Sequence, residues 1–132
     1  MRILIFISNM PWTLVGIIGA MLSGVHKVRF VRKPPALIFY VRSFWWYKWL
    51  PGKKRVRAIT NGHTIQLGPL ELPQDLEHEL VHVEQAEREP FIHPLRYLME
   101  SRKQGYRRNK YEVEAYARAR NEYTDLKVKN RS

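Results

Sequence analysis

The sequence contains no cysteine, and its first 70 residues contain no acidic residue. The absence of cysteine excludes a disulfide framework, a thiolate zinc site and a cysteine nucleophile. The first 70 residues carry eleven lysine and arginine residues, whereas residues 71–132 carry twelve basic and twelve acidic residues. The whole formal net charge of +11 therefore belongs to the first half of the chain, which argues against a uniformly basic protein.

The sequence also lacks an internal repeat, a glycine-rich phosphate loop and a Ser/His/Asp pattern. Its 132 residues are the size of one domain. A content of 45% hydrophobic and 12% aromatic residues excludes intrinsic disorder.

Residues 3–25 form a stretch without a single charge. About 20 apolar residues are enough to span a bilayer as a helix, although Pro11 is expected to kink or restart one. Three interpretations are open: a spanning or deeply inserted helix, a buried core helix, and a cleaved signal peptide. We favour the membrane, because no small-residue cleavage site of the A-x-A kind follows and basic residues come next.

Those basic residues are Lys27, Arg29, Arg32 and Lys33. Under the positive-inside rule, they predict a membrane-associated protein whose bulk lies on the cytoplasmic side. Residues 43–51 then combine three tryptophans with a tyrosine beside further basic residues, which predicts contact with an anionic membrane surface. Packing of these aromatics on a domain core is the alternative. Nucleic acid is a less favoured partner, because it does not explain the uncharged run.

A β-hairpin is expected next. Two β-favouring runs, Arg55–Thr60 and His63–Leu67, flank Asn61-Gly62, which is the strongest two-residue hairpin signal. In the second run, His63, Ile65 and Leu67 alternate with Thr64 and Gln66, so the two sets are expected on opposite faces.

Three helices are expected after the hairpin. The first begins near Leu72 and stops before Pro90, and the second covers Pro94–Gln104 and ends at Gly105. The third begins after Asn109, which is a good N-cap residue.

The first of these helices contains an H-E-x-x-H sequence, His78-Glu79-Leu80-Val81-His82. Histidines at positions i and i+4 project from the same side of a helix, one turn apart, so both can bind one zinc ion. Glu79 follows the first histidine and can act as the general base toward water on the metal. A catalytic zinc ion needs a third protein ligand and one open position.

A glutamate of the third helix is the best candidate for that ligand. Glu112 occupies the N3 position of a capping box with Asn109, which gives it a structural role. Glu114 points about 200° around the helix from Glu112, among small and aromatic residues, and a buried carboxylate needs a partner. We therefore predict Glu114 as the third ligand. A surface glutamate paired with Arg118 is the alternative.

Other candidates for the third ligand are weaker. His93 lies just past the end of the first helix, where a loop histidine is more often a surface or capping residue. The longer pattern H-E-x-x-H-x-x-G-x-x-H is excluded, because Gln85 and Arg88 occupy its glycine and histidine positions.

The run L-E-H-E-L-V-H-V-E-Q, followed by N-K-Y-E-V-E-A-Y, resembles the gluzincin branch of zinc metallopeptidases. The preceding R-A-I-T-N-G-H-T-I-Q-L-G-P is similar to the strand pair of small bacterial zincin-like domains that carry H-E-L-x-H-x-x-Q. The resemblance covers about half the chain. It implies Zn²⁺ held by His78, His82 and Glu114, Glu79 as the catalytic base, and a peptide or protein substrate.

The expected fold is α+β, a minimal zincin-like domain of a hairpin or small sheet and about three helices, preceded by an apolar N-terminal helix. Four segments are predicted: an apolar membrane-associated segment with a basic flank at 1–33, an aromatic and basic connector at 34–54, the metal-binding domain at 55–126 and a polar tail at 127–132. The predicted function is that of a membrane-associated zinc metallopeptidase. The first alternative is a non-catalytic zinc-stabilised interaction module at a membrane surface, and the second is a basic lipid or nucleic-acid binder with incidental histidines.

Overall fold

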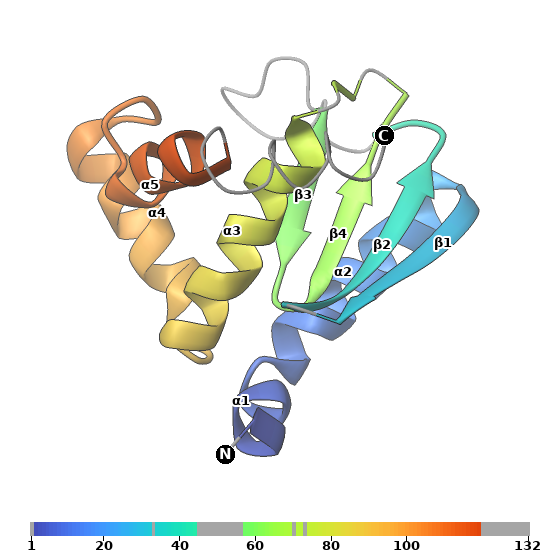
Figure 1. Ribbon diagram of the computed structural model, residues 1–132, viewed down its shortest axis with the longest axis horizontal. Coiled ribbons are helices and arrows are strands. Elements are labelled where there is room, and N and C mark those ends of the chain that lie inside the picture. The colour runs from blue at the N-terminus through green and yellow to red at the C-terminus, as the bar shows by residue number, and fades with distance from the viewer. Residues whose placement is uncertain (1, 33, 45–56, 70, 73, 120–132) are drawn as a thin grey trace, which may run out of the picture.

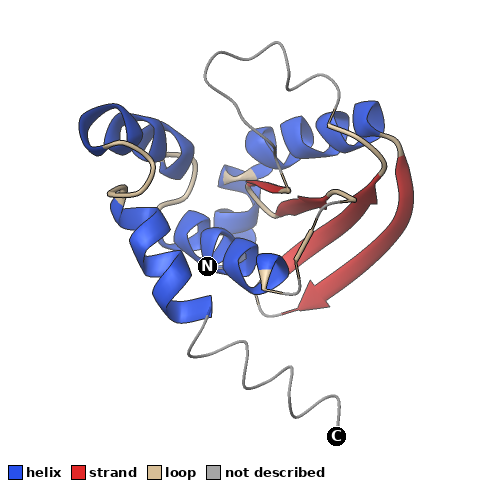
Figure 2. Ribbon diagram, turned by 90° about the horizontal axis from the view of Figure 1, so that it is seen from above, coloured by secondary structure: helices blue, strands red, loops and turns tan. Residues whose placement is uncertain are grey.

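The computed structural model describes residues 2–32, 34–44, 57–69, 71–72 and 74–119. Within these ranges the chain has a mixed α+β fold with five helices and one four-stranded sheet (Figures 1 and 2). In chain order the elements are α1 (Arg2–Ser8), α2 (Met10–Ser23), β1 (Val25–Arg32), β2 (Pro35–Val41), β3 (Ala58–Asn61), β4 (Thr64–Leu67), α3 (Asp75–Arg88), α4 (His93–Gln104) and α5 (Lys110–Arg118).

The uncharged N-terminal run forms two helices, where one was expected. They meet at Asn9, which is fully buried. Its Nδ2 donates a hydrogen bond to the carbonyl oxygen of Ala86 at 3.1 Å, and its Oδ1 accepts one from the N–H of Phe91 at 2.8 Å. The junction is therefore anchored to the C-terminal end of α3. Among the described residues, none of the helices has the length and apolar character needed to cross a bilayer.

The sheet has the strand order β1-β2-β4-β3. β1 and β2 are antiparallel, β2 and β4 are parallel, and β3 and β4 are antiparallel. β1 and β2 were not predicted, because residues 25–41 were assigned to a basic flank and a connector. The expected segment boundary after residue 33 falls between these two paired strands, and both strands belong to the same sheet as the hairpin.

The predicted hairpin is confirmed for its described part, and Arg55 and Val56 lie outside the described residues. Its loop is shifted by one residue, because Asn61 pairs with Thr64 and leaves Gly62 and His63 as the turn. Gly62 has a φ of 57° and His63 is not in the left-handed region, which is the pattern of a type II′ turn with glycine first.

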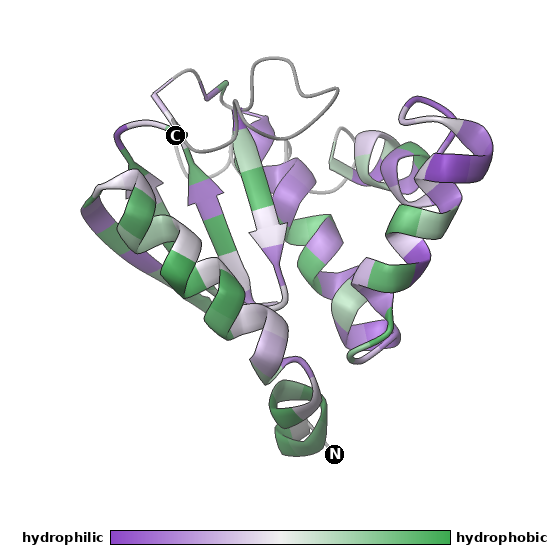
Figure 3. Cartoon of the chain, turned by 180° about the vertical axis from the view of Figure 1, so that it is seen from behind, coloured by the Kyte–Doolittle hydropathy of each residue, from purple (hydrophilic) through white to green (hydrophobic). Residues whose placement is uncertain are grey.

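The sheet lies between α2 and α3, as the front view of Figure 1 and the rear view of Figure 3 show. Toward α3, a buried cluster consists of Ala36, Ile38, Ile65, Leu67, Leu80 and Val83. Toward α2, a smaller cluster consists of Ala20, Phe39 and Val41. The predicted alternation in β4 is confirmed, since Ile65 and Leu67 face α3 while Gln66 Nε2 donates to the Gly16 carbonyl oxygen of α2.

The three predicted C-terminal helices are present, and α4 and α5 lie beside α3 on the side away from the strands (Figure 1). α3 begins at Asp75, a few residues later than expected, and ends before Pro90. Gly105, with a φ of 79°, ends α4 as predicted. Asn109 caps α5, because its Oδ1 accepts a hydrogen bond from the N–H of Tyr111 at 2.9 Å.

Candidate metal centre

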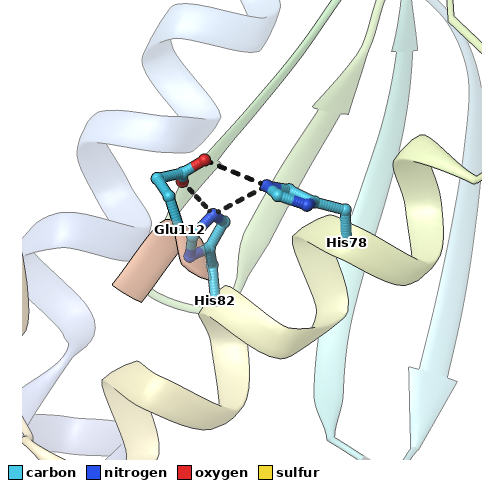
Figure 4. Close-up of side chains that lie close together, drawn as sticks. All are labelled: His78, His82 and Glu112. Atoms are coloured by element: carbon cyan, nitrogen blue, oxygen red, sulfur yellow. Dashed lines mark hydrogen bonds and ion pairs between the residues drawn. The ribbon is translucent and has the colours of Figure 1, made fainter. Parts of the chain in front are cut away.

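α3 presents His78 and His82 on one side, one helical turn apart, as the H-E-x-x-H spacing predicts (Figure 4). Both residues are buried. Their Nε2 atoms face each other at 3.2 Å. A neutral imidazole carries one N–H, so these two nitrogens can share the proton of an Nε2–H tautomer, and a cation bound by both nitrogens can take its place.

α5 brings a carboxylate to the same point. Glu112 is buried, and its Oε2 lies 3.2 Å from His78 Nε2, while its Oε1 lies 2.6 Å from His82 Nε2. Ligand atoms around a tetrahedral zinc ion with bonds of about 2.0–2.1 Å are roughly 3.3 Å apart. The distance between the two Nε2 atoms and the distance from His78 Nε2 to Glu112 Oε2 are both close to this value. Two imidazole nitrogens and one carboxylate oxygen are a donor set that suits a metal ion, and this group can hold one.

The structure corrects the predicted third ligand, because Glu112 and not Glu114 lies beside the histidines. Glu114 Oε1 instead accepts hydrogen bonds from Gln85 Nε2 at 2.7 Å and Arg88 Nη2 at 2.5 Å. Its Oε2 lies 3.5 Å from Arg118 Nη1, the i,i+4 pairing that was the alternative interpretation. Glu112 forms no capping box, since its carboxylate is directed at the histidines.

Gln85 orients His82 through the ring nitrogen that faces away from Glu112 and His78. Its Oε1 lies 2.8 Å from His82 Nδ1, so Nδ1 carries the proton and donates it, which leaves Nε2 directed toward Glu112 and His78. Gln85 is itself fixed, since its Nε2 donates to the carbonyl oxygen of Tyr111 at 2.9 Å as well as to Glu114. Glu114 therefore acts on the candidate site through Gln85.

Two tyrosines contact Glu112, and a third contacts His78. Tyr97 donates from its Oη to Glu112 Oε1 at 3.2 Å, and Tyr106 also donates a hydrogen bond to this carboxylate. Tyr116 lies with its ring centroid 4.3 Å from that of His78, and its Oη is 3.1 Å from Tyr106 Oη. Burial raises the pKa of Tyr97 and of Tyr106 above the ordinary value, so both remain protonated donors.

Charge is concentrated in the His82–Glu112 pair. Burial alone would lower the pKa of His82, but the hydrogen bond to Glu112 and the charges of Glu79 and Glu112 raise it to about 9. Burial opposes ionisation of Glu112, yet the hydrogen bonds from the two histidines hold the pKa of this carboxyl well below its usual range. Without a metal ion, the centre therefore holds an imidazolium–carboxylate pair near neutral pH.

Glu79, the predicted general base, is buried on α3. Its Oε2 accepts a short hydrogen bond from Thr60 Oγ1 of β3, so the carboxylate is held between the helix and the last strand of the sheet. Its charge acts on His82, whose pKa it raises.

His93 was the weaker candidate ligand, and it is not one of the three grouped residues. It is buried at the start of α4, with its Nε2 3.3 Å from Gln85 Oε1. Burial and the nearby charge of His82 lower the pKa of His93 to about 4, so it is neutral above that pH.

Comparison of the chain with protein-family models, with curated proteins and with solved structures finds no match. The residues that sequence reasoning missed are Glu112, Gln85, Tyr97 and Tyr106. A signal for Glu112 exists, since Ala115 and Ala119 follow it at helical spacing and all three are buried on one face of the last helical segment.

Proposed function

We propose that this chain is a zinc-dependent peptidase of gluzincin type, in which His78, His82 and Glu112 hold Zn²⁺. The observation that supports it most is the convergence of two Nε2 atoms and one carboxylate on a single point within an H-E-x-x-H helix. When bound, Zn²⁺ would lower the pKa of a water molecule toward about 7 and polarise a carbonyl group.

Glu79 supplies the general base in this proposal. It accepts the water proton and returns it to the leaving amine. Its hydrogen bond to Thr60 keeps the carboxylate next to β3, the strand at one end of the sheet order in the described part of the chain. A peptide that pairs with β3 as an added strand would bring its carbonyl groups toward Glu79.

Tyr111, Tyr116, Tyr123 and His63 have side chains that can donate a hydrogen bond to an oxyanion, and Tyr116 fits this role best. It lies against His78 and is about half exposed. His63 is committed to Asn9 and to the carbonyl oxygen of Pro35, and the Oη of Tyr111 donates to Glu89. Tyr123 lies outside the described residues.

Replacing Glu79 by glutamine tests the proposal. We expect the E79Q protein to bind one equivalent of zinc as the wild type does, and to lose at least about 100-fold of its cleavage rate on a peptide library. Thr60 can still donate to the glutamine oxygen, which preserves the fold around the position. Equal cleavage by wild type and E79Q would contradict the assigned role.

The alternative is a zinc-stabilised interaction module without catalysis. It is favoured by the burial of all three metal-binding residues, because a structural site is closed whereas a catalytic one keeps a position open. Zinc binding in the wild type without hydrolysis of any peptide, together with a chelator-dependent melting temperature, would select this function.

A further inference from the structure

α2 buries its small residues and exposes its large apolar ones, unlike a helix that faces water. Its residues toward the sheet are small and buried: Thr13, Gly16, Gly19, Ala20 and Ser23. Its large apolar residues on the other side are at least half exposed: Leu14, Val15, Ile18 and Met21. A surface helix of a soluble domain normally carries charged or polar residues on its outward face, and α2 carries no charge at all.

β1 extends this apolar surface beside α2. The register pairs Val28 with Phe39 and Phe30 with Leu37. Phe39 and Leu37 face α2, and directly opposite residues of an antiparallel pair point to the same face of a sheet. Val28 and Phe30 therefore lie on the α2 side, where both are more than half exposed.

α1 continues the surface beyond the start of α2. Ile3, Leu4 and Ile7 are more than half exposed. Seen from the α2 side, the ribbons of α1 and α2 are hydrophobic along most of their length (Figure 3). We call the exposed large apolar side chains of α1, α2 and the α2 side of β1 the apolar face. Exposed apolar surfaces that extend over several elements mark sites of association.

The elements that form the apolar face carry only positive charge. The first acidic residue of the sequence is Glu71, so none of the elements that form the face contributes a negative charge. Arg32 follows Phe30 by two residues on the same side of β1, and Lys27 and Arg29 lie on the other side of this strand. All three are exposed. An apolar surface whose own elements carry cations and no acidic residue is complementary to an anionic lipid interface.

We propose that the apolar face docks into the interface of an anionic lipid bilayer, with α2 lying in the plane of the membrane. The inward side of α2 is fully occupied by the sheet, because Gln66 donates to the Gly16 carbonyl oxygen and a Cβ at Gly16 would overlap Thr64 Oγ1. Only the outward side is open to lipid. α3 packs on the opposite face of the sheet, so the metal centre is held away from the bilayer. This inference does not depend on metal binding or catalysis.

Vesicle binding by the full chain tests the proposal. We expect the protein to cosediment with vesicles of phosphatidylcholine containing phosphatidylglycerol, and to bind pure phosphatidylcholine at least about tenfold more weakly. Ile18→Glu places a charge in the middle of the apolar face and should weaken binding by more than about tenfold. Leu98→Glu is the matched control, because Leu98 is an equally exposed apolar residue on α4. Zinc binding and circular dichroism report whether each variant keeps its fold.

The absence of cysteine allows a second measurement of the docking geometry. An environment-sensitive fluorophore attached at Ile18→Cys should shift its emission to the blue on addition of anionic vesicles, whereas the same label at Leu98→Cys should not. Equal shifts at both positions, or the absence of vesicle binding in a folded wild type, would overturn the proposal. A dimer in lipid-free solution that Ile18→Glu dissociates, without vesicle binding, would also overturn it and assign the face to a second copy of the chain.

Discussion

Gln85 connects the candidate metal centre with the ion pairs on the outer side of α3. It accepts from His82 and donates to Glu114, which in turn pairs with Arg88. Partners of this kind fix the orientation and basicity of a ligating histidine, although they never touch the metal.

Replacement of Gln85 by leucine is therefore expected to weaken zinc binding by about 10- to 100-fold while both histidines remain. Competition with a chromophoric chelator measures the affinity. Gln104→Leu, at the exposed end of α4, is the matched control and should leave the affinity unchanged. An unaltered affinity in Q85L would show that Gln85 serves packing alone.

Zinc binding is also expected to depend on pH through His82. The pKa of His82 is raised to about 9 in the metal-free protein, so zinc has to displace its proton at neutral pH. The proton stabilises the metal-free fold fully below the unfolded pKa of about 6.5, and this contribution disappears as the pH rises through about 9. The zinc dissociation constant should accordingly fall by about tenfold from pH 7 to pH 8, the change that release of one proton produces. Calorimetry in buffers of different ionisation enthalpy should detect the released proton. A zinc affinity that does not change with pH would contradict displacement of a proton from His82.

The grouping of His78 with His82 was predictable from the sequence, whereas the glutamate that joins them was not. The spacing of His78 and His82 fixes their common side on any helix. The choice between Glu112 and Glu114 depends on how α5 is rotated against α3, which is a tertiary property. The capping-box pattern gave Glu112 a local role, and the contact with two buried histidines overrode that role.

The contact between α2 and the sheet shows how a helix without large inward residues is held. Gly16 lets the backbone of α2 approach β4 closely, and Gln66 donates to its carbonyl oxygen at 3.3 Å. Such close contact replaces the interdigitated side chains of an ordinary helix–sheet interface.

Gly16→Ala is consequently expected to destabilise the protein. Alanine favours a helix interior over glycine by about 1 kcal/mol, but the added Cβ would overlap Thr64 Oγ1, and overpacking costs about 1–3 kcal/mol. We expect the overlap to prevail and the free energy of unfolding to fall by about 1–2 kcal/mol, measured by urea denaturation. Val15→Ala, one residue away on the exposed face, is the control and should change it by less than about 0.5 kcal/mol. A more stable G16A protein would contradict the close approach.

The C-terminal helices and the hairpin were predictable because their ends carry local information. Asn109, Gly105 and Gly62 each specify backbone geometry by themselves. β1 was missed because its residues were interpreted as a basic flank, and β2 was missed because residues 34–54 were interpreted as a connector. The alternation of Val28 and Phe30 with Arg29 is a strand pattern, but only the pairing with β2 and the cover of α2 reveal its register.

For the molecule as a whole, the candidate metal centre joins α3 to α5 and thereby links two parts of the fold. The coarse α+β class followed from the sequence, while the position of α2 against the sheet did not, since it depends on contacts between distant segments. Loss of a metal ion from such a junction is expected to affect the cooperative unfolding of the chain.

Zinc at about 100 times its dissociation constant should therefore stabilise the protein by about 2.7 kcal/mol. For a chain of this size the melting temperature should rise by about 10 °C, as measured by differential scanning calorimetry, and a chelator should reverse the rise. His78→Ala removes one residue of the candidate metal centre and should abolish the zinc-dependent shift. A shift of equal size in H78A would assign the stabilisation to zinc bound elsewhere.

The most direct test compares zinc affinity in two glutamine variants of neighbouring glutamates, Glu112→Gln and Glu114→Gln. The structure predicts one zinc ion per wild-type chain, an affinity reduced by more than about 100-fold in E112Q, and a reduction of at most about tenfold in E114Q, where only the support of Gln85 is changed. A wild type that binds no zinc, or an E114Q protein that loses zinc while E112Q retains it, would contradict the account.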